Sequence, residues 1–397
     1  MHLYDTATRS TLAVVPRHGR IGLYVCGITP YDGGHVGHAF TYHTFDILTR
    51  HLRATGIEVR SVRNVTDVDD DILRVASVRG LDYLSFGRAE TARFDRDMSD
   101  LGLLPVDAAP RATDHVPAMV EWVERLVEAG CAYSVDGWVF FETRALSAYG
   151  ALSGLDRTSM VALSRLRGAD PDDPRKRDPL DFVLWQRSRP GEPAWESPWS
   201  RGRPGWHIEC TVLSTSELAV PIDIHGGGTD LIYPHHECEL AQAHAAGVAD
   251  YVRHWVHVAM VGYAGEKMSK SLGNLVFVRD LVDSEGAAVV RLLLSAHHHR
   301  SDWEYHSALL DAARERWQRY RAVIDGDARL SDADAGEFLD AVTNRIADDL
   351  DTPGALAILD ALAEQASRQR THGSVASAEV LTALLGTLGI AAAAVAA

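Results

Sequence analysis

The sequence predicts an α/β fold with a doubly wound parallel sheet, an α/β insertion and a C-terminal helical bundle. Strand and helix patterns alternate from residue 21 to about residue 115, which is typical of parallel sheets covered by helices. A polar, proline-broken loop at residues 167–178 indicates an insertion after this alternation, and a periodicity of three to four residues dominates beyond Trp303. At 397 residues, the chain is long enough for two or three domains.

The first strand and the turn that follows it are the most informative stretch. The apolar run Ile21–Val25 predicts a buried strand. Glycines and a proline break the chain between Gly27 and Gly34, and HVGH (residues 35–38) leads into a helical segment. Such a turn presents backbone N–H groups and the positive end of a helix dipole to an anion. His35 and His38 are therefore candidate donors to a phosphate, although an ordinary strand-to-helix turn gives the same pattern.

A second strand is expected at residues 56–62, followed by the acidic stretch NVTDVDDD (residues 64–71). Its carboxylates suit a Mg²⁺ ion. They also suit a helix N-cap and first turn, where they accept N–H bonds and face the positive end of the dipole. The sequence favours the capping interpretation. Further helices are expected at residues 81–100 and 115–130.

The predicted regions follow one another along the chain. Residues 1–115 form the first half of a nucleotide-binding domain, and residues 116–181 form the insertion. The second half, residues 182–255, begins with a strand at Phe182–Trp185 and continues through Ile222–His225. Residues 256–305 carry a KMSKS segment, and residues 306–397 form the bundle, with helices at residues 309–324, 335–350 and 353–369.

Composition narrows the functional classes. Hydrophobic residues make up 46% of the chain and charged residues 24%, and no apolar run approaches the roughly 18–20 residues that cross a bilayer. The N-terminus lacks the layout of a signal peptide, so we expect a cytoplasmic protein with no membrane contact. The net charge of −16 disfavours a polyanionic partner such as RNA, although a local basic patch would still permit one.

Metal-ligating side chains come from three separate places. Cys26 ends the first strand, Cys210 follows WHIE, and His235 and Glu239 lie four residues apart, on one face of a helix. Thiolates and imidazole are the ligands that zinc prefers, with a carboxylate as an option for the fourth. A structural explanation also stays open, because buried cysteines often serve as small apolar groups. Cys238 is expected to be structural and to point away from the metal.

The segment EKMSKS (residues 266–271) lies between glycines. Lys267 and Lys270, with two serine hydroxyls, suit a pyrophosphate leaving group whose charge grows as an adenylate is transferred. HVGH followed by KMSKS resembles the paired signatures of class I aminoacyl-tRNA synthetases. The resemblance implies a Rossmann-like catalytic fold and a stem-contact role for residues 256–305. It also implies activation of a carboxylate by ATP to an acyl-adenylate, followed by acyl transfer.

The resemblance also implies roles for individual residues. His35, His38, Lys267 and Lys270 would act on the phosphates of ATP, which enters as a substrate with Mg²⁺. His225 and Asp230 are candidates for the general base of the transfer step. The residues that would surround the adenylate are Gly27, Thr29, Thr41, Asn64, Thr66, Trp206, His225, Gly228, Thr229, Asp230 and Val261.

Two longer motifs narrow the family. GRPGWHIEC (residues 202–210) and DIHGGGTDLIYPHHE (residues 223–237) resemble cysteinyl-tRNA synthetases and their relatives. This implies zinc at Cys26, Cys210, His235 and Glu239, with L-cysteine as the amino acid. Zinc with an open position selects a thiolate over serine, because a hydroxyl is a much poorer zinc ligand.

The acceptor is the remaining question. LYDTA near the start and RGADPDDPRKRDPLD (residues 167–181) resemble the cysteine ligases of mycothiol biosynthesis, which join cysteine to the amine of glucosaminyl-inositol. Leu166 and Ala169 depart from the ERGGDP segment of those ligases. The length beyond Trp303 leaves room for one helical bundle and for no recognisable anticodon-binding module.

HGGGTDLIYPHHECELAQ, with Glu239, is in contrast nearer the synthetases. We therefore expect a monomeric amine ligase that releases AMP and pyrophosphate. Cysteinyl-tRNA synthetase and a ligase for another amine are the alternatives. A catalytically inactive adenylate-binding regulator is disfavoured by the intact HVGH and KMSKS.

Overall fold

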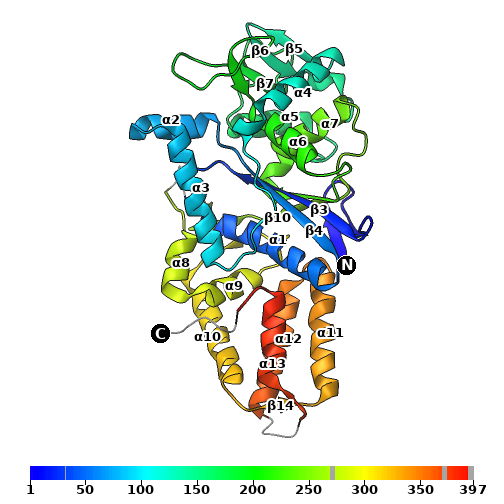
Figure 1. The fold of residues 1–397 in the computed structure, drawn as a ribbon, viewed down its shortest axis with the longest axis vertical. Helices are drawn as coiled ribbons and strands as arrows, with labels where there is room; N and C mark the ends of the chain where they lie inside the picture. Colours follow the sequence, from blue (N-terminus) through cyan, green and yellow to red (C-terminus); the bar gives the residue numbers. More distant parts are fainter. Residues whose placement is uncertain (32, 269–272, 369–372, 392–397) are drawn as a thin grey trace.

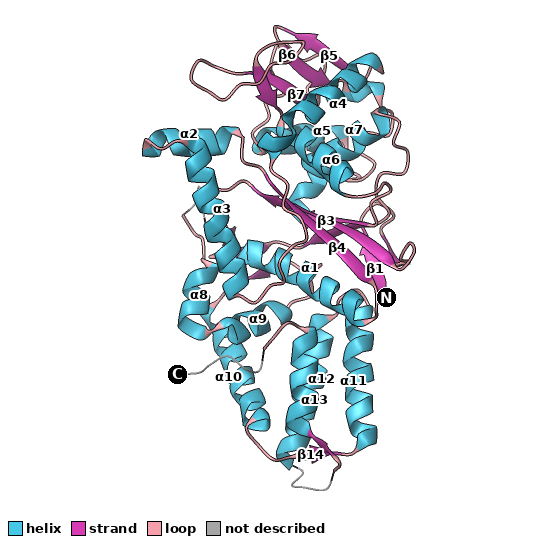
Figure 2. Cartoon of the chain, in the orientation of Figure 1, coloured by secondary structure: helices cyan, strands magenta, loops and turns pink. Residues whose placement is uncertain are grey.

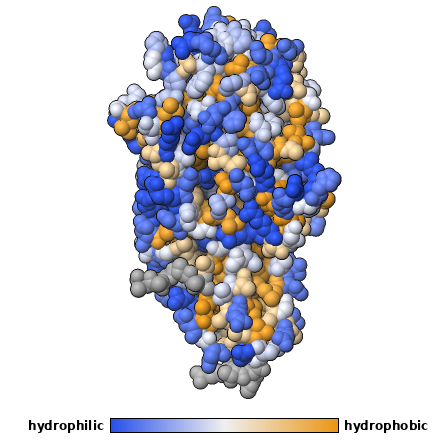
Figure 3. All heavy atoms as spheres, viewed as in Figure 1, coloured by the Kyte–Doolittle hydropathy of each residue, from blue (hydrophilic) through white to orange (hydrophobic). Residues whose placement is uncertain are grey.

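The computed structural model describes residues 1–31, 33–268, 273–368 and 373–391. Figure 1 shows three regions along the long axis, with the inserted domain at one end, a parallel sheet in the middle and a helical bundle at the other end. Hydrophilic and hydrophobic side chains are interspersed on the face seen in Figure 3. Within the described residues, no helix combines the length and the apolar character that a membrane span requires.

The central sheet has four parallel strands in the order β10-β9-β3-β4. This confirms the predicted α/β class. After β3 the chain crosses through α1 to β4 on one side, and it returns much later to β9 on the other side. Ligand crevices form at such a reversal, beside the carboxyl ends of the strands. The strands are β3 (Arg20–Ile28), β4 (Glu58–Val65), β9 (Ile224–Gly228) and β10 (Trp255–Val258).

Alternation along β3 separates two hydrophobic cores. Leu23 and Val25 pack in the core that contains helix α1 (Val36–Ala54). Tyr24 and Cys26 point to the opposite face and belong to the core formed with α6 (Trp206–Glu217) and α7 (Glu237–Ala245). Because successive side chains of a strand face opposite sides of the sheet, Cys26 is directed toward Cys210 on α6.

The inserted domain contains its own antiparallel sheet, in the order β5-β6-β7-β8 (Figure 2). β7 (Phe182–Arg187) pairs antiparallel with β6 (Trp138–Phe141) on one side and with β8 (Gly202–Pro204) on the other. β6 in turn pairs antiparallel with β5 (Ala132–Val135). Phe182–Trp185, the predicted first strand of the second half of the nucleotide-binding domain, thus belongs to the antiparallel sheet and not to the central parallel one. A short apolar run is compatible with either sheet, because the strand with which it pairs is decided by contacts between distant parts of the chain. The domain boundaries themselves stay a prediction.

The three helices predicted for the C-terminal bundle are present, and a fourth follows them. They are α10 (Ser307–Ile324), α11 (Asp332–Ala347), α12 (Thr352–Arg368) and α13 (Ser377–Thr387). Arg291 on α9 (Ala287–Ser295) ties this bundle to the sheet region. Its fully buried guanidinium donates to the carbonyl of Leu388 and to the carboxylate of Asp46 on α1.

The remaining elements complete the chain. Short helical turns are η1 (Ala112–His115), η2 (Thr143–Ala145), η3 (Thr229–Leu231) and η4 (Ile232–His236). The other helices are α2 (Asp70–Arg79), α3 (Tyr83–Asp100), α4 (Val116–Glu128), α5 (Arg157–Leu166) and α8 (Val278–Glu285). The other strands are β1 (His2–Asp5), β2 (Ser10–Ala13), β11 (Val261–Tyr263), β12 (Glu266–Lys267), β13 (Trp303–Glu304), β14 (Arg329–Leu330) and β15 (Val375–Ala376).

The acidic stretch after β4 caps helix α2. The side chain of Asp69 accepts hydrogen bonds from the backbone N–H groups of Asp71 and Ile72. Asp70 pairs with Arg203, and Asp71 pairs with Arg74 at 2.7 Å. Each carboxylate thus has a cap or ion-pair role, and the capping interpretation is confirmed.

Asp69→Asn is expected to stabilise the protein at neutral pH. Burial raises the pKa of Asp69 to about 6, so ionisation between about pH 4 and pH 6 costs folding stability. Asparagine keeps the cap without the charge. Because the side chain keeps partial solvent contact, we expect a gain of about 1–2 kcal/mol at pH 7, which disappears near pH 4. Urea unfolding at both pH values measures it. Asp69→Ala, which loses the cap, should be less stable than Asp69→Asn at both, and a less stable Asp69→Asn at pH 7 would contradict the assignment.

Candidate active site and metal centre

Four side chains from three segments meet at the carboxyl end of β3. Cys26, Cys210, His235 and Glu239 each offer one ligand atom, and these atoms all lie within 4.8 Å of one another. The sulfur atoms of Cys26 and Cys210 are 3.7 Å apart, and His235 Nε2 is 3.2 Å from Glu239 Oε1. All four side chains are buried. The structure thus brings together the residues predicted as metal ligands.

Glu239 is held as a buried anion by its neighbours. Its Oε2 accepts a hydrogen bond from Tyr251 at 3.2 Å and lies 3.0 Å from His225 Nε2. Burial raises the pKa of Glu239, but its interactions with His225 and His235 and the hydrogen bond from Tyr251 outweigh this and leave the pKa lowered. A buried carboxylate that stays ionised requires a compensating positive charge. A metal ion at the cluster would supply that charge.

The other three groups suit the same ion. Burial raises the pKa values of Cys26 and Cys210, so these thiols need a nearby cation to ionise. Burial lowers the pKa of His235 to about 3, which keeps the imidazole neutral, as metal ligation requires. Two thiols, one imidazole and one carboxylate form a donor set that zinc favours. The residues therefore fit a zinc ion.

A chain of buried histidines behind Cys26 was missed in the sequence. His236 Nε2 lies 3.2 Å from the sulfur of Cys26, and its Nδ1 lies 2.7 Å from His257 Nε2. His257 Nδ1 is in turn 2.7 Å from Thr6 Oγ1. The only signal in the sequence was the second histidine of the His235-His236 pair. Such partners orient a ligand and tune its basicity.

The HVGH turn begins helix α1. His35 is the N-cap, its Nδ1 accepts from the backbone N–H of His38 at 3.4 Å, and the two rings stack with centroids 3.7 Å apart. The backbone on both sides of His35 pairs with the segment just after KMSKS, through Val36 N to Val276 O and Val278 N to Gly34 O, both at 2.9 Å. The described segment at residues 276–278 therefore lies against the start of α1. Lys270 and the side chain of Lys267 lie outside the described residues.

The side chain of Asn64 joins the ends of β3 and β4. Gly27 N–H donates to Asn64 Oδ1 at 2.7 Å, and Asn64 Nδ2 donates to Thr66 Oγ1 at 3.2 Å. A Cβ at Gly27 would lie 1.6 Å from the backbone oxygen of Asn64, so only glycine fits there. These three predicted adenylate residues thus form one continuous edge.

Most other residues predicted around the adenylate border the same sheet edge. Thr29 follows β3, Gly228 ends β9, and Thr229 and Asp230 form the turn η3 directly after it. Thr41 lies one turn beyond Gly37 in α1, and its hydroxyl donates to the Gly37 carbonyl at 3.3 Å. Val261 starts β11 and is buried.

Trp206 and His225 take different positions. Trp206 begins α6, is 38% exposed, and stacks on His235 with centroids 4.1 Å apart. Its indole therefore packs against one of the predicted metal ligands. His225 is fully buried, and its Nε2 lies 3.0 Å from Glu239 Oε2, so it lies behind the cluster and away from solvent. This position favours a supporting role over the expected role as general base.

Comparison with known proteins identifies the family. The protein-family model of the tRNA synthetases class I (C) catalytic domain matches residues 13–315 of this chain. The chain is 45% identical to the L-cysteine:1D-myo-inositol 2-amino-2-deoxy-alpha-D-glucopyranoside ligase of Acidothermus cellulolyticus, over 90% of this chain and 88% of that protein. It is also 45% identical to the ligase of the same name from Kineococcus radiotolerans, over 98% and 95%.

A solved structure shares the fold. The methionyl-tRNA synthetase of Mycobacterium tuberculosis, in complex with methionyl-adenylate, superposes with a TM-score of 0.65 at 19% identity and covers 93% of this chain and 88% of its own. The Rossmann-like catalytic fold implied by HVGH and KMSKS is thereby confirmed. The chain therefore belongs to the class I (C) tRNA synthetase catalytic-domain family and groups within it with the L-cysteine:1D-myo-inositol 2-amino-2-deoxy-alpha-D-glucopyranoside ligases.

Proposed function

We propose that this protein is an ATP-dependent, AMP-forming ligase that joins L-cysteine to the amine of glucosaminyl-inositol, the reaction of mycothiol biosynthesis. The relatives with that name cover most of the chain. The observation that carries the proposal is the buried set of Cys26, Cys210, His235 and Glu239 at the carboxyl end of β3, where the residues predicted to surround the adenylate also lie. Zn²⁺, when bound there, supplies a thiophilic position that favours the sulfur of cysteine over the hydroxyl of serine.

In the first step, the carboxylate of cysteine attacks the α-phosphorus of ATP. An O–P bond to the amino acid forms, the bond to the β,γ-pyrophosphate breaks, and cysteinyl-AMP results. His35 and His38, at the start of α1, face the phosphates together with the N–H groups of that helix end. Lys267 and Lys270 balance the charge that grows on pyrophosphate, and Mg²⁺ enters bound to ATP.

In the second step, the acceptor amine attacks the acyl carbon and AMP leaves. The amine must lose a proton, because only its free base is a nucleophile. Asp230 follows β9 at the adenylate edge, whereas His225 is buried behind the cluster. Asp230 is therefore the better candidate for the base.

The acceptor is tested by competition between two substrates. Purified protein is supplied with ATP and radiolabelled cysteine, together with glucosaminyl-inositol or with bulk transfer RNA. We expect label only in the pseudodisaccharide, with one AMP formed per product. Label in transfer RNA would favour the synthetase alternative. Absence of cysteine-dependent ATP–pyrophosphate exchange would favour the inactive regulator.

Two further expectations belong to this proposal. The protein acts as a monomer in the cytoplasm, and its acceptor is a small amine that binds beside the adenylate. Size-exclusion chromatography with light scattering tests the monomer directly.

A further inference from the structure

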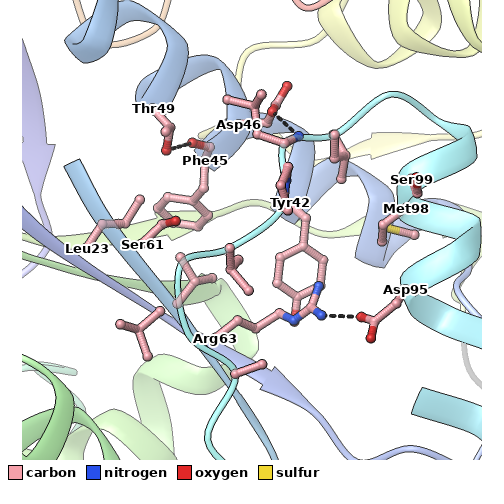
Figure 4. Close-up of a pocket in the computed structure, with 17 residues that line it drawn as sticks. Leu23, Tyr42, Phe45, Asp46, Thr49, Ser61, Arg63, Asp95, Met98 and Ser99 are labelled. Carbon is pink, nitrogen blue, oxygen red and sulfur yellow. Dashed lines mark hydrogen bonds and ion pairs between the residues drawn. The ribbon is translucent and has the colours of Figure 1, made fainter. Parts of the chain in front are cut away.

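A cavity lies on the face of the parallel sheet opposite the metal cluster. It has a volume of about 440 Å³ and is enclosed by α1, α3, strands β3 and β4, and the connection at residues 103–109 (Figure 4). Leu23 and Val25 of β3 line it, whereas Tyr24 and Cys26 of the same strand face the metal side. The cavity is therefore distinct from the proposed active site and separated from it by the sheet.

The wall is mostly apolar, with one guanidinium that has spare donors. Phe45, Met98 and Leu103 are among the apolar lining residues. Arg63 lies in the wall, is 8% exposed, and donates through Nη2 to Asp95 at 2.5 Å. Its Nε is buried and makes no hydrogen bond among the described residues. A guanidinium carries five N–H donors, and Asp95 is the one side chain among the described residues that accepts from Arg63.

The two carboxylates that line the cavity differ in how many hydrogen bonds and ion pairs they make. Asp46 accepts from Arg50 at 2.8 Å and from the backbone N–H of Leu104 at 2.8 Å, and it also pairs with Arg291. Asp95 has Arg63 as its ion-pair partner, and its side chain is 51% exposed. Asp95 can therefore turn to solvent at little cost, whereas Asp46 is fixed. A ligand carboxylate would replace Asp95 on Arg63.

We propose that this cavity is an effector site for a small monocarboxylate with an aromatic or branched aliphatic body. The apolar wall takes the body of the ligand. Arg63 takes its carboxylate, and the rings of Tyr42 and Phe94, whose centroids lie 5.4 and 4.9 Å from the guanidinium carbon, hold that cation in place. The volume is within the range usual for small-molecule sites.

Tyr42 links this site to the metal cluster. Its ring lines the cavity, and its hydroxyl donates to the backbone carbonyl of Cys26 at 3.0 Å. A ligand that shifts the Tyr42 ring thus acts on the strand position that carries a predicted metal ligand. This coupling rests on the proposed function, whereas binding to the cavity does not.

Binding is tested with 4-phenylbutyrate as the probe, by calorimetric titration of the full chain. We expect saturable binding that weakens at least about tenfold in Arg63→Met. It should vanish in Val106→Phe, which fills the cavity. Arg96→Met, on the exposed side of α3, should bind as the wild type does, and the uncharged 4-phenylbutanol should bind at least about tenfold more weakly. Thermal unfolding confirms that each variant is folded.

Two results would overturn the proposal. The first is a wild type without saturable binding, and the second is binding that neither Arg63→Met nor Val106→Phe changes. The coupling has its own readout, the KM for cysteine in pyrophosphate exchange. We expect the bound probe to shift this KM in the wild type and not in Tyr42→Phe. A folded protein that binds the probe but performs no pyrophosphate exchange would refute the proposed function and leave the cavity site intact. An unchanged KM for cysteine in an active, probe-bound wild type would refute the coupling.

Discussion

Cys210→Ser is expected to lower cysteine-dependent ATP–pyrophosphate exchange by more than about 100-fold and to reduce bound zinc. Cys210 is 1% exposed, and its sulfur lies 3.7 Å from that of Cys26. A serine hydroxyl there stays protonated and is a poor zinc ligand, so the donor set falls to one thiol, one imidazole and one carboxylate. Exchange kinetics and metal analysis by mass spectrometry measure the two effects.

Cys238→Ser is the matched control. Cys238 is equally buried, but its sulfur lies 3.5 Å from the hydroxyl of Tyr149 and it is not among the clustered ligands. We expect it to retain zinc and exchange activity. Full activity of Cys210→Ser without zinc would refute the metal role, and equal losses in both variants would indicate a general effect of polar substitution in this core.

Asp46→Asn is expected to destabilise the protein by about 3–5 kcal/mol. Asp46 is 6% exposed and is the carboxylate partner of Arg291, which is 1% exposed. Burial lowers the pKa of Arg291, and Asp46 counteracts this, so the substitution leaves a buried cation without its counter-charge. Urea unfolding at pH 7 and low salt measures the loss.

A surface pair serves as the control for Asp46→Asn. Glu58→Gln removes the partner of Arg20, a pair at 2.8 Å whose side chains are 71% and 63% exposed, and should cost less than about 1 kcal/mol. The double variant Asp46→Asn/Arg291→Met should recover part of the loss, because it removes the unpaired charge. A loss for Asp46→Asn that is no larger than that for Glu58→Gln would show that the buried pair contributes little.

The sequence predicted the elements whose signal is local. The buried strand before Gly27, the turn at HVGH and the periodic helices of the bundle all lie where expected, because apolar spacing, glycine breaks and caps act within a few residues. The sequence also indicated that the candidate metal ligands come from three separate segments, which carry Cys26, Cys210 and the His235–Glu239 pair. Their convergence to one point was implied only by resemblance.

Features that depend on contacts between distant parts of the chain could not be predicted from local sequence patterns. The strand Phe182–Arg187 has the same apolar character whether it joins the parallel sheet or pairs with Trp138–Phe141, and only tertiary packing selects the second. His225 also looked like a ligand-facing residue in a glycine-rich strand, yet it points into the core against Glu239. Both faces of β9 are buried, so the sequence pattern of this strand does not show which side of the sheet His225 takes.

The separation of the ligands along the chain has a consequence for biosynthesis. Cys26 and Glu239 meet across 213 residues of sequence. The pocket for the ion therefore cannot exist on a ribosome until more than half of the polypeptide has emerged, and until then the first thiol is an ordinary reactive group on a nascent strand. A metal ion bound by these four residues would therefore stabilise the fold only after this long loop has closed, and it would not nucleate folding.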